Sequence, residues 1–146
     1  MYNRALAEFI ISEPEYMIMH DWWALLTASA FGKIGTIFEP TVLYRQHENN
    51  DIGAKKKQSL AEYLLYKLTH YRETENAINR TYLQAESFMV EFGDMLPYEH
   101  KGLLEAYSSI PTLPRIGRLK VMFKYKTFRH GFARKMAQFL FVFWRR

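Results

Sequence analysis

The stretch of sequence that decides the fold is HDWWALLTASAFG, residues 20–32. From Asp21 to Phe31 it predicts a helix, which Gly32 ends in a position that favours a left-handed residue. Asp21 then lies at the helix N-terminus, where free amides and the helix dipole stabilise a carboxylate. The two adjacent tryptophans point about 100° apart on a helix, so only one of them can lie fully in a core.

Shorter elements are expected on both sides of this helix. Asn3 is predicted to cap a short helix that ends at residue 9 or 10. Residues 16–19 predict a short strand or a buried loop. Residues 33–38 and 41–47 are rich in β-formers and predict two strands, or one strand and an extended arm.

The second of these β-rich segments leads into a polar loop. Its period-two alternation places Arg45 and His47 on one face. Residues 48–53 then form a polar turn, which is interpreted either as a lid over a ligand or as a solvated loop.

The remainder of the chain is predicted to be helical. Two stripes of apolar residues recur at helical spacing, and each is expected to bury one face of a helix. They comprise Leu60, Leu64, Leu68 and Tyr71, and then Ile78, Tyr82, Ala85, Met89, Phe92 and Leu96. Gly93 and Pro97 end the second helix. A third helix follows at residues 98–109, and the prolines at 111 and 114 separate it from the terminal segment.

The composition is that of a globular protein of one domain, or of part of a larger one. Of the 146 residues, 49% are hydrophobic and 24% are charged, which excludes a disordered or collagen-like chain. There is no cysteine, so a disulfide scaffold, a thiolate zinc site and a cysteine nucleophile are all excluded. With only three aspartates, no two are close enough in sequence to form a local metal-binding pair.

Charge is distributed unevenly along the chain. Residues 1–105 carry ten Lys and Arg against fifteen Asp and Glu, formally −5, whereas residues 106–146 carry ten Lys and Arg and no acid, formally +10. Aromatic residues are interleaved with the basic ones from Arg115 onward. A helix of this kind can lie on an anionic membrane surface, or its aromatics can pack on the preceding helices while the charges are solvated. Nucleic acid is not expected as a partner, because no nucleic-acid-binding motif accompanies the charge.

Four segments together resemble bacterial family 2 glycosyltransferases, specifically the rhamnosyltransferase-like group of surface-polysaccharide enzymes. The matching segments are NRAL at 3–6, MIMHDWW at 17–23, ASAFGKI at 28–34 and YRQH at 44–47. The resemblance is dense over residues 3–54 and looser over residues 58–146. It implies an α/β fold that is mostly helical as present: the C-terminal part of a glycosyltransferase A-type nucleotide-sugar fold at 1–54, followed by a helical bundle with a basic amphipathic tail at 55–146.

The resemblance also implies roles for the adjacent tryptophans and for the two residues before them. Asp21 matches the general base, which takes the proton from the acceptor hydroxyl in an inverting transfer. The alternative is that Asp21 only caps a helix. His20 stands where the wider superfamily often has an acid. The resemblance implies that it either tunes the basicity of Asp21 or binds the acceptor. Trp22 or Trp23 is free to stack on a sugar ring, unless both are packing residues.

A diphosphate and metal site is implied at the second β-rich segment. Arg45 matches a contact to the diphosphate of the nucleotide-sugar, and His47 a ligand to the divalent metal, Mg or Mn, that the full-length family uses. The alternatives are a salt bridge and a structural histidine. The nucleotide-binding half of the family, with its Asp-x-Asp type motif, is absent from these 146 residues.

We therefore expect a partial inverting glycosyltransferase that is inactive alone. It would transfer a sugar, for which the resemblance suggests rhamnose, to a glycan or lipid-linked acceptor. A truncated gene, a split gene or an expressed fragment would each give such a chain, and a split gene would encode the N-terminal half separately. The alternative is a noncatalytic helical module that binds a membrane or a protein. No secretory signal is seen at the start of the chain, so a cytoplasmic location is expected, with the tail on the inner face of the cell membrane.

Overall fold

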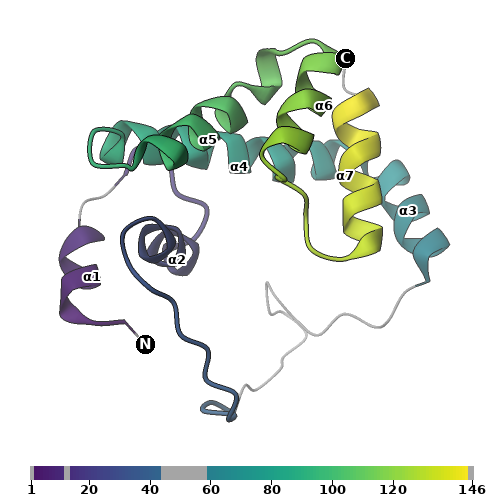
Figure 1. Ribbon diagram of the computed structural model, residues 1–146. Coiled ribbons are helices and arrows are strands. Elements are labelled where there is room, and N and C mark those ends of the chain that lie inside the picture. Colours follow the sequence, from purple (N-terminus) through teal and green to yellow (C-terminus); the bar gives the residue numbers. More distant parts are fainter. Residues whose placement is uncertain (1, 12–13, 44–58, 145–146) are drawn as a thin grey trace.

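The computed structural model describes residues 2–11, 14–43 and 59–144, and within these ranges it is mostly helical and has no strand. The helices are α1 (Arg4–Phe9), α2 (His20–Phe31), α3 (Leu60–Thr69), α4 (Tyr71–Phe92), α5 (Tyr98–Ser108), α6 (Arg115–Lys124) and α7 (Phe132–Trp144), with a short 3₁₀ helix, η1 (Ile110–Thr112), between α5 and α6. In Figure 1, α4 runs across the molecule, with α1 and α2 near one end and α3, α6 and α7 near the other.

The C-terminal half of α4 packs with α2 in one hydrophobic cluster. Trp23 of α2 is buried against Phe88 and Phe92 of α4, and Leu96 closes the cluster beyond the end of α4. Phe31, at the other end of α2, contacts the same two phenylalanine rings. The helix predicted from Asp21 to Phe31 is thus held on α4 by the aromatic side chains of α2.

The N-terminal half of α4 supports a second cluster. Ile78 and Tyr82 of α4 pack with Ile110 of η1, Met122 of α6, and two residues of α7. Those two residues are Phe141 and Val142. Because α4 contributes buried residues to both clusters, it joins the start of the chain to its end, and α5 packs on both through Leu104 and Tyr107. The division expected near residue 54 lies outside the described residues.

The local helix signals are confirmed for several elements. Asn3 caps α1 by accepting a hydrogen bond from the N–H of Leu6, at 3.0 Å. Gly93 follows α4 as its C-cap, and α5 begins directly after Pro97. The second predicted stripe is confirmed as well: five of its six members are buried, and Met89 is half-buried.

The first predicted stripe is wrong in part. Leu68 is exposed rather than buried, and Tyr71 belongs to α4, because the chain leaves the helical geometry at His70. Local amphipathicity does not secure burial unless a neighbouring helix covers the whole stripe. In the structure α3 is followed immediately by α4 and lies at the edge of the bundle (Figure 1).

The two strands expected at 33–38 and 41–47 are wrong within the described residues. Residues 33–38 and 41–43 are extended or irregular and exposed, and no strand is paired with them. The remainder of the second segment, from 44 to 47, lies outside the described residues. A β-branched sequence has strand propensity, but a strand forms only where a neighbour completes the hydrogen-bond ladder. Gly32 was also expected to be left-handed, whereas its φ of −140° is that of extended backbone.

The basic terminal segment forms two helices rather than one. The break between α6 and α7 contains Lys126, with φ of 52°, and Gly131, with φ of 90°. Both values lie in the left-handed region, which glycine adopts without strain. The chain therefore reverses, and α6 and α7 lie side by side (Figure 1). No helix in the described residues combines the length and the apolar character that crossing a bilayer requires.

Candidate functional site

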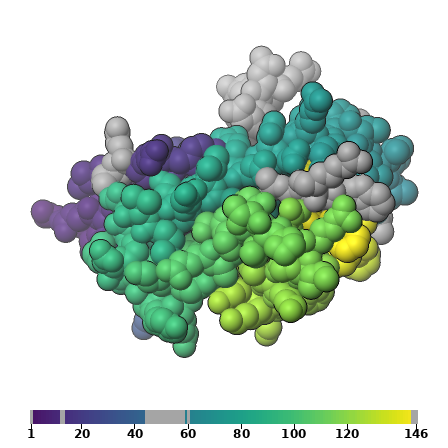
Figure 2. All heavy atoms as spheres, turned by 90° about the horizontal axis from the view of Figure 1, so that it is seen from above, coloured from purple at the N-terminus to yellow at the C-terminus, as the bar shows by residue number. Residues whose placement is uncertain are grey.

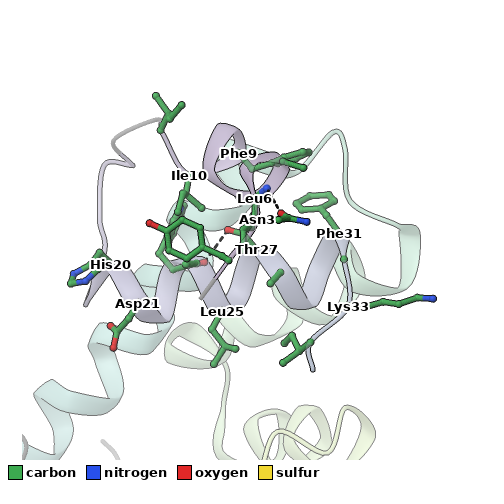
Figure 3. Close-up of a pocket in the computed structure, with 18 of the residues that line it drawn as sticks. Asn3, Leu6, Phe9, Ile10, His20, Asp21, Leu25, Thr27, Phe31 and Lys33 are labelled. Atoms are coloured by element: carbon green, nitrogen blue, oxygen red, sulfur yellow. Dashed lines mark hydrogen bonds between the residues drawn. The ribbon is translucent and has the colours of Figure 1, made fainter. Parts of the chain in front are cut away.

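A groove of about 980 Å³ lies along α1, the segment that leads into α2, and α2 itself (Figure 3). Its volume is within the range of small-molecule sites in proteins. The apolar wall includes Leu6, Phe9, Ile10, Leu25 and Phe31. His20 and Asp21 lie at the N-terminal end of α2, and Lys33 lies just beyond its C-terminal end, so the charged residues are at the two ends of the groove.

Asp21 occupies the first turn of α2 and is exposed. One of its carboxylate oxygens, Oδ1, accepts a hydrogen bond from the N–H of Trp22 at 2.9 Å. Met19, the residue before α2, is the N-cap and makes no side-chain capping bond. In Figure 3 the Asp21 side chain leaves α2 on the same side as Leu25, pointing away from α1, so it lies at the rim of the groove.

The two tryptophans are separated as helical geometry requires. Trp23 is 1% exposed and meets the Phe88 ring edge-on, with 5.1 Å between the centroids. Trp22 is 46% exposed. Trp22 is thus the tryptophan whose ring can stack on a ligand, while the ring of Trp23 is covered by the core. The sugar-stacking role that the resemblance implies for either residue stays a prediction.

Arg45 and His47 lie outside the described residues, as does the loop expected at 48–53. Of the predicted site the structure thus describes only the consecutive residues 20–23, of which His20, Asp21 and Trp23 line the groove and Trp22 does not. Within the described residues no three His, Asp or Glu side chains gather closely enough to hold a metal ion. The described residues do not supply the metal site that the resemblance implies, and we derive no step through a metal.

The segment that leads into α2 is fixed on α4 by polar residues that the sequence analysis missed. The N–H of Tyr16 donates to Ser87 Oγ at 3.0 Å, and the N–H of Ile18 donates to Gln84 Oε1 at 3.1 Å. Arg80 Nε donates to the Tyr16 hydroxyl at 2.9 Å. The sequence did contain a signal for this attachment, because residues 80, 84 and 87 lie on one face of α4 by helical spacing. All three residues are polar, however.

Comparisons with protein-family models, with curated proteins and with solved structures find no match for this chain. The glycosyltransferase resemblance therefore depends on the quoted sequence segments alone and stays a prediction. What the structure contributes is the local arrangement: the exposed Asp21 carboxylate and the His20 imidazole line the groove at the first turn of α2. The exposed Trp22 ring is on the same turn but does not line the groove.

Proposed function

We propose that the chain is the acceptor-side part of an inverting glycosyltransferase that moves a sugar, rhamnose by resemblance, from a nucleotide-sugar to a glycan acceptor. The observation that carries the proposal is the exposed Asp21 carboxylate at the rim of the 980 Å³ groove, directly before the exposed Trp22. An acceptor hydroxyl can reach such a carboxylate, whereas it could not reach one sealed in the core.

The reaction needs one proton to be removed and one leaving group to be held. Asp21 takes the proton of the acceptor hydroxyl while the oxygen attacks the anomeric carbon, and the bond from that carbon to the nucleotide diphosphate breaks with inversion. Trp22 offers a flat apolar surface to a sugar ring. The groups that hold the diphosphate belong to the nucleotide-binding half and to Arg45 and His47, so the described residues alone complete no catalytic cycle.

The glycosyltransferase A-type fold is part of the same proposal. Residues 33–43 form no helix and bend at Glu39, and their side chains at Ile34, Ile37, Phe38 and Val42 are exposed. Exposed β-branched and aromatic residues on an extended chain are suited to join the sheet of another polypeptide. We propose that the nucleotide-binding half supplies that sheet, and its reading frame is expected in frame with, or next to, the coding sequence of this chain.

The test is turnover by the two halves together. Combined with the nucleotide-binding half, the chain should form product from a nucleotide-sugar, and the chain alone should form none. Asp21→Asn should lower kcat by about 10²–10⁴-fold, the usual contribution of a general base, with little change in KM. Asp94→Asn is the matched control, because Asp94 is exposed, lies between α4 and α5 and does not line the groove. Near-normal turnover of Asp21→Asn would remove it from the mechanism, and product from the chain alone would overturn the partial-enzyme proposal.

The second candidate is a noncatalytic helical module that binds a membrane or a protein. The observation that favours it is the number of large apolar side chains exposed on α6 and α7, away from the groove. Absence of any reading frame for a nucleotide-binding half, together with unchanged NMR spectra on addition of oligosaccharides, would favour this candidate over the transferase.

A further inference from the structure

The helices α6 and α7 each have an apolar face that the bundle leaves uncovered. Ile116 and Phe123 of α6 are 71% and 60% exposed, and Phe132 of α7 is 70% exposed. On α7 the exposed residues Leu140 and Phe143 continue the face that Phe132 begins, because residues eleven apart are three turns apart on a helix. We call these five residues the outer face.

The opposite side of each helix is already used by the core. Met122 of α6 and both Phe141 and Val142 of α7 are buried in the cluster that includes Ile78. The helices are therefore apolar on two sides, and only one of those sides is needed to hold the fold. Single exposed apolar residues are ordinary on a protein surface, but five on two neighbouring helices form a patch that points to an interaction.

Contacts between the helices place the outer face on one surface. Near one end, the Arg115 guanidinium lies 5.9 Å from the centre of the Phe143 ring. Near the other end, the Phe128 ring lies 5.2 Å from the Phe123 ring and 4.6 Å from Lys135 Nζ. Figure 2 shows the green and yellow segments, which include α6 and α7, together along one side of the molecule.

Positive charge surrounds this patch. Six exposed basic residues belong to α6, α7 and the turn between them: Arg115, Lys120, Lys124, Lys126, Arg134 and Lys135. Lys120 lies on the same side of α6 as Phe123, three residues later, and Lys124 at the end of α6 is exposed as well. Residues 106–146 contain no acid, so nothing within the segment neutralises these charges.

We infer that the outer face binds the surface of an anionic lipid bilayer. Exposed aromatic and aliphatic side chains can enter the boundary between headgroups and acyl chains, while the lysines and arginines beside them meet anionic headgroups. The exposed phenylalanines distinguish this surface from a site that meets only a phosphate backbone. This inference goes beyond the proposed transferase function and does not depend on it, since the outer face and the groove involve different helices.

Vesicle binding by the purified chain tests the inference. It should bind vesicles of phosphatidylcholine mixed with phosphatidylglycerol, should bind phosphatidylcholine alone far less, and should lose affinity as salt screens the charges. The double variant Lys120→Gln/Lys124→Gln should bind the anionic vesicles about thirtyfold more weakly, because each basic residue near the surface contributes about 1 kcal/mol. The control Arg4→Gln/Lys33→Gln removes the same charge near the groove and should bind as the parent does.

A label reports which surface meets the lipid. The chain has no cysteine, so a single introduced one can carry an environment-sensitive fluorophore. A label at Phe123→Cys should shift to the blue on anionic vesicles, and a label at Phe38→Cys, a position 93% exposed at the other end of the chain, should not. Any one of four results would overturn the inference. These are equal binding to neutral and anionic vesicles, equal weakening of binding by the two double variants, a fluorescence shift at position 38 alone, and no vesicle binding by a folded chain. The last result would turn attention to a protein partner.

Discussion

Gln84 of α4 accepts a hydrogen bond from the backbone N–H of Ile18, with 3.1 Å between Oε1 and N. The two residues are 66 positions apart, and the bond fixes the chain two residues before α2 begins at His20. The position of Asp21 at the rim of the groove is therefore supported by a side chain that does not line the groove, together with the packing of Trp23 and Phe31 on α4. Ser87, one turn further along α4, holds the N–H of Tyr16 in the same way.

Gln84→Leu is expected to loosen this attachment without disturbing α4. Leucine occupies a similar volume and favours a helix, but it leaves the part-buried N–H of Ile18 without its acceptor, which should cost about 1–3 kcal/mol. Urea unfolding measures the loss of stability, and limited proteolysis should cut faster within residues 14–19. Glu86→Leu, on the exposed side of α4, is the control and should change stability by less than about 0.5 kcal/mol. Equal proteolysis of the two variants would show that Gln84 does not hold the segment.

The adjacent tryptophans should differ sharply in their contribution to stability. Trp23→Ala removes a ring that is 1% exposed and packed on Phe88 and Phe92, so it should lower the free energy of unfolding by about 3–5 kcal/mol. Trp22→Ala should lower it by about 0.5 kcal/mol or less, because that ring is half-exposed. Denaturant unfolding of the two variants checks this, and similar losses would contradict the assignment of Trp23 alone to the core.

Tyr107 should make stability depend on pH in the alkaline range. Burial raises the pKa of the Tyr107 phenol above its ordinary value. Its hydroxyl shares a hydrogen bond with Thr81 Oγ1, with 2.9 Å between the two oxygens. A phenol with a raised pKa contributes stability fully below the unfolded-state pKa of about 10, and that contribution is lost as pH rises through the folded-state value.

Tyr107→Phe should therefore be less stable than the parent by about 1 kcal/mol at neutral pH, through loss of the hydrogen bond. Its free energy of unfolding should also fall less steeply than that of the parent as the pH rises above about 10. Parallel curves for the two proteins over that range would contradict the prediction. Tyr98→Phe, at an exposed ring, controls for the change of residue type at neutral pH.

The sequence predicts those parts of the fold that local interactions determine. The cap of α1 at Asn3 and the end of α4 at Gly93 depend on neighbours a few residues away, and both are confirmed. The extended segment at 33–38 was predicted as a strand because its residues favour one, but the described residues contain no ladder to pair with it. Propensity is local, whereas strand pairing needs a partner strand elsewhere in the chain or on another chain.

The candidate site was predictable to a similar degree. Helical geometry required one tryptophan of the pair to be more exposed, but only tertiary packing shows that it is Trp22. The support from Gln84 and Ser87 was missed because their polarity suggests a solvent-exposed face, whereas both are buried. The reversal between α6 and α7 was missed too, although Gly131 was available as a signal that the helix breaks.

One buried amide side chain, that of Gln138, bonds twice to the turn that forms the outer face. Gln138 of α7 accepts a hydrogen bond from the N–H of Arg129 at 2.7 Å and donates one to the carbonyl of Thr127 at 2.9 Å. Both partners lie in the turn, so a single side chain fixes its path against α7. Gln138→Met keeps the volume but removes both bonds, and it should lower the free energy of unfolding by about 1–3 kcal/mol.

Hydrogen exchange gives the more specific test, because the amide of Arg129 should exchange faster in Gln138→Met than in the parent while the amides in the middle of α4 change only with global stability. The same variant should weaken binding to anionic vesicles, since a mobile turn no longer holds Phe123 and Phe132 on one surface. Arg134→Gln, exposed on α7, is the control for the exchange rates. Unchanged exchange at Arg129 would show that the turn keeps its path without Gln138, and the two helices would then owe their arrangement to the core residues Met122 and Phe141 alone.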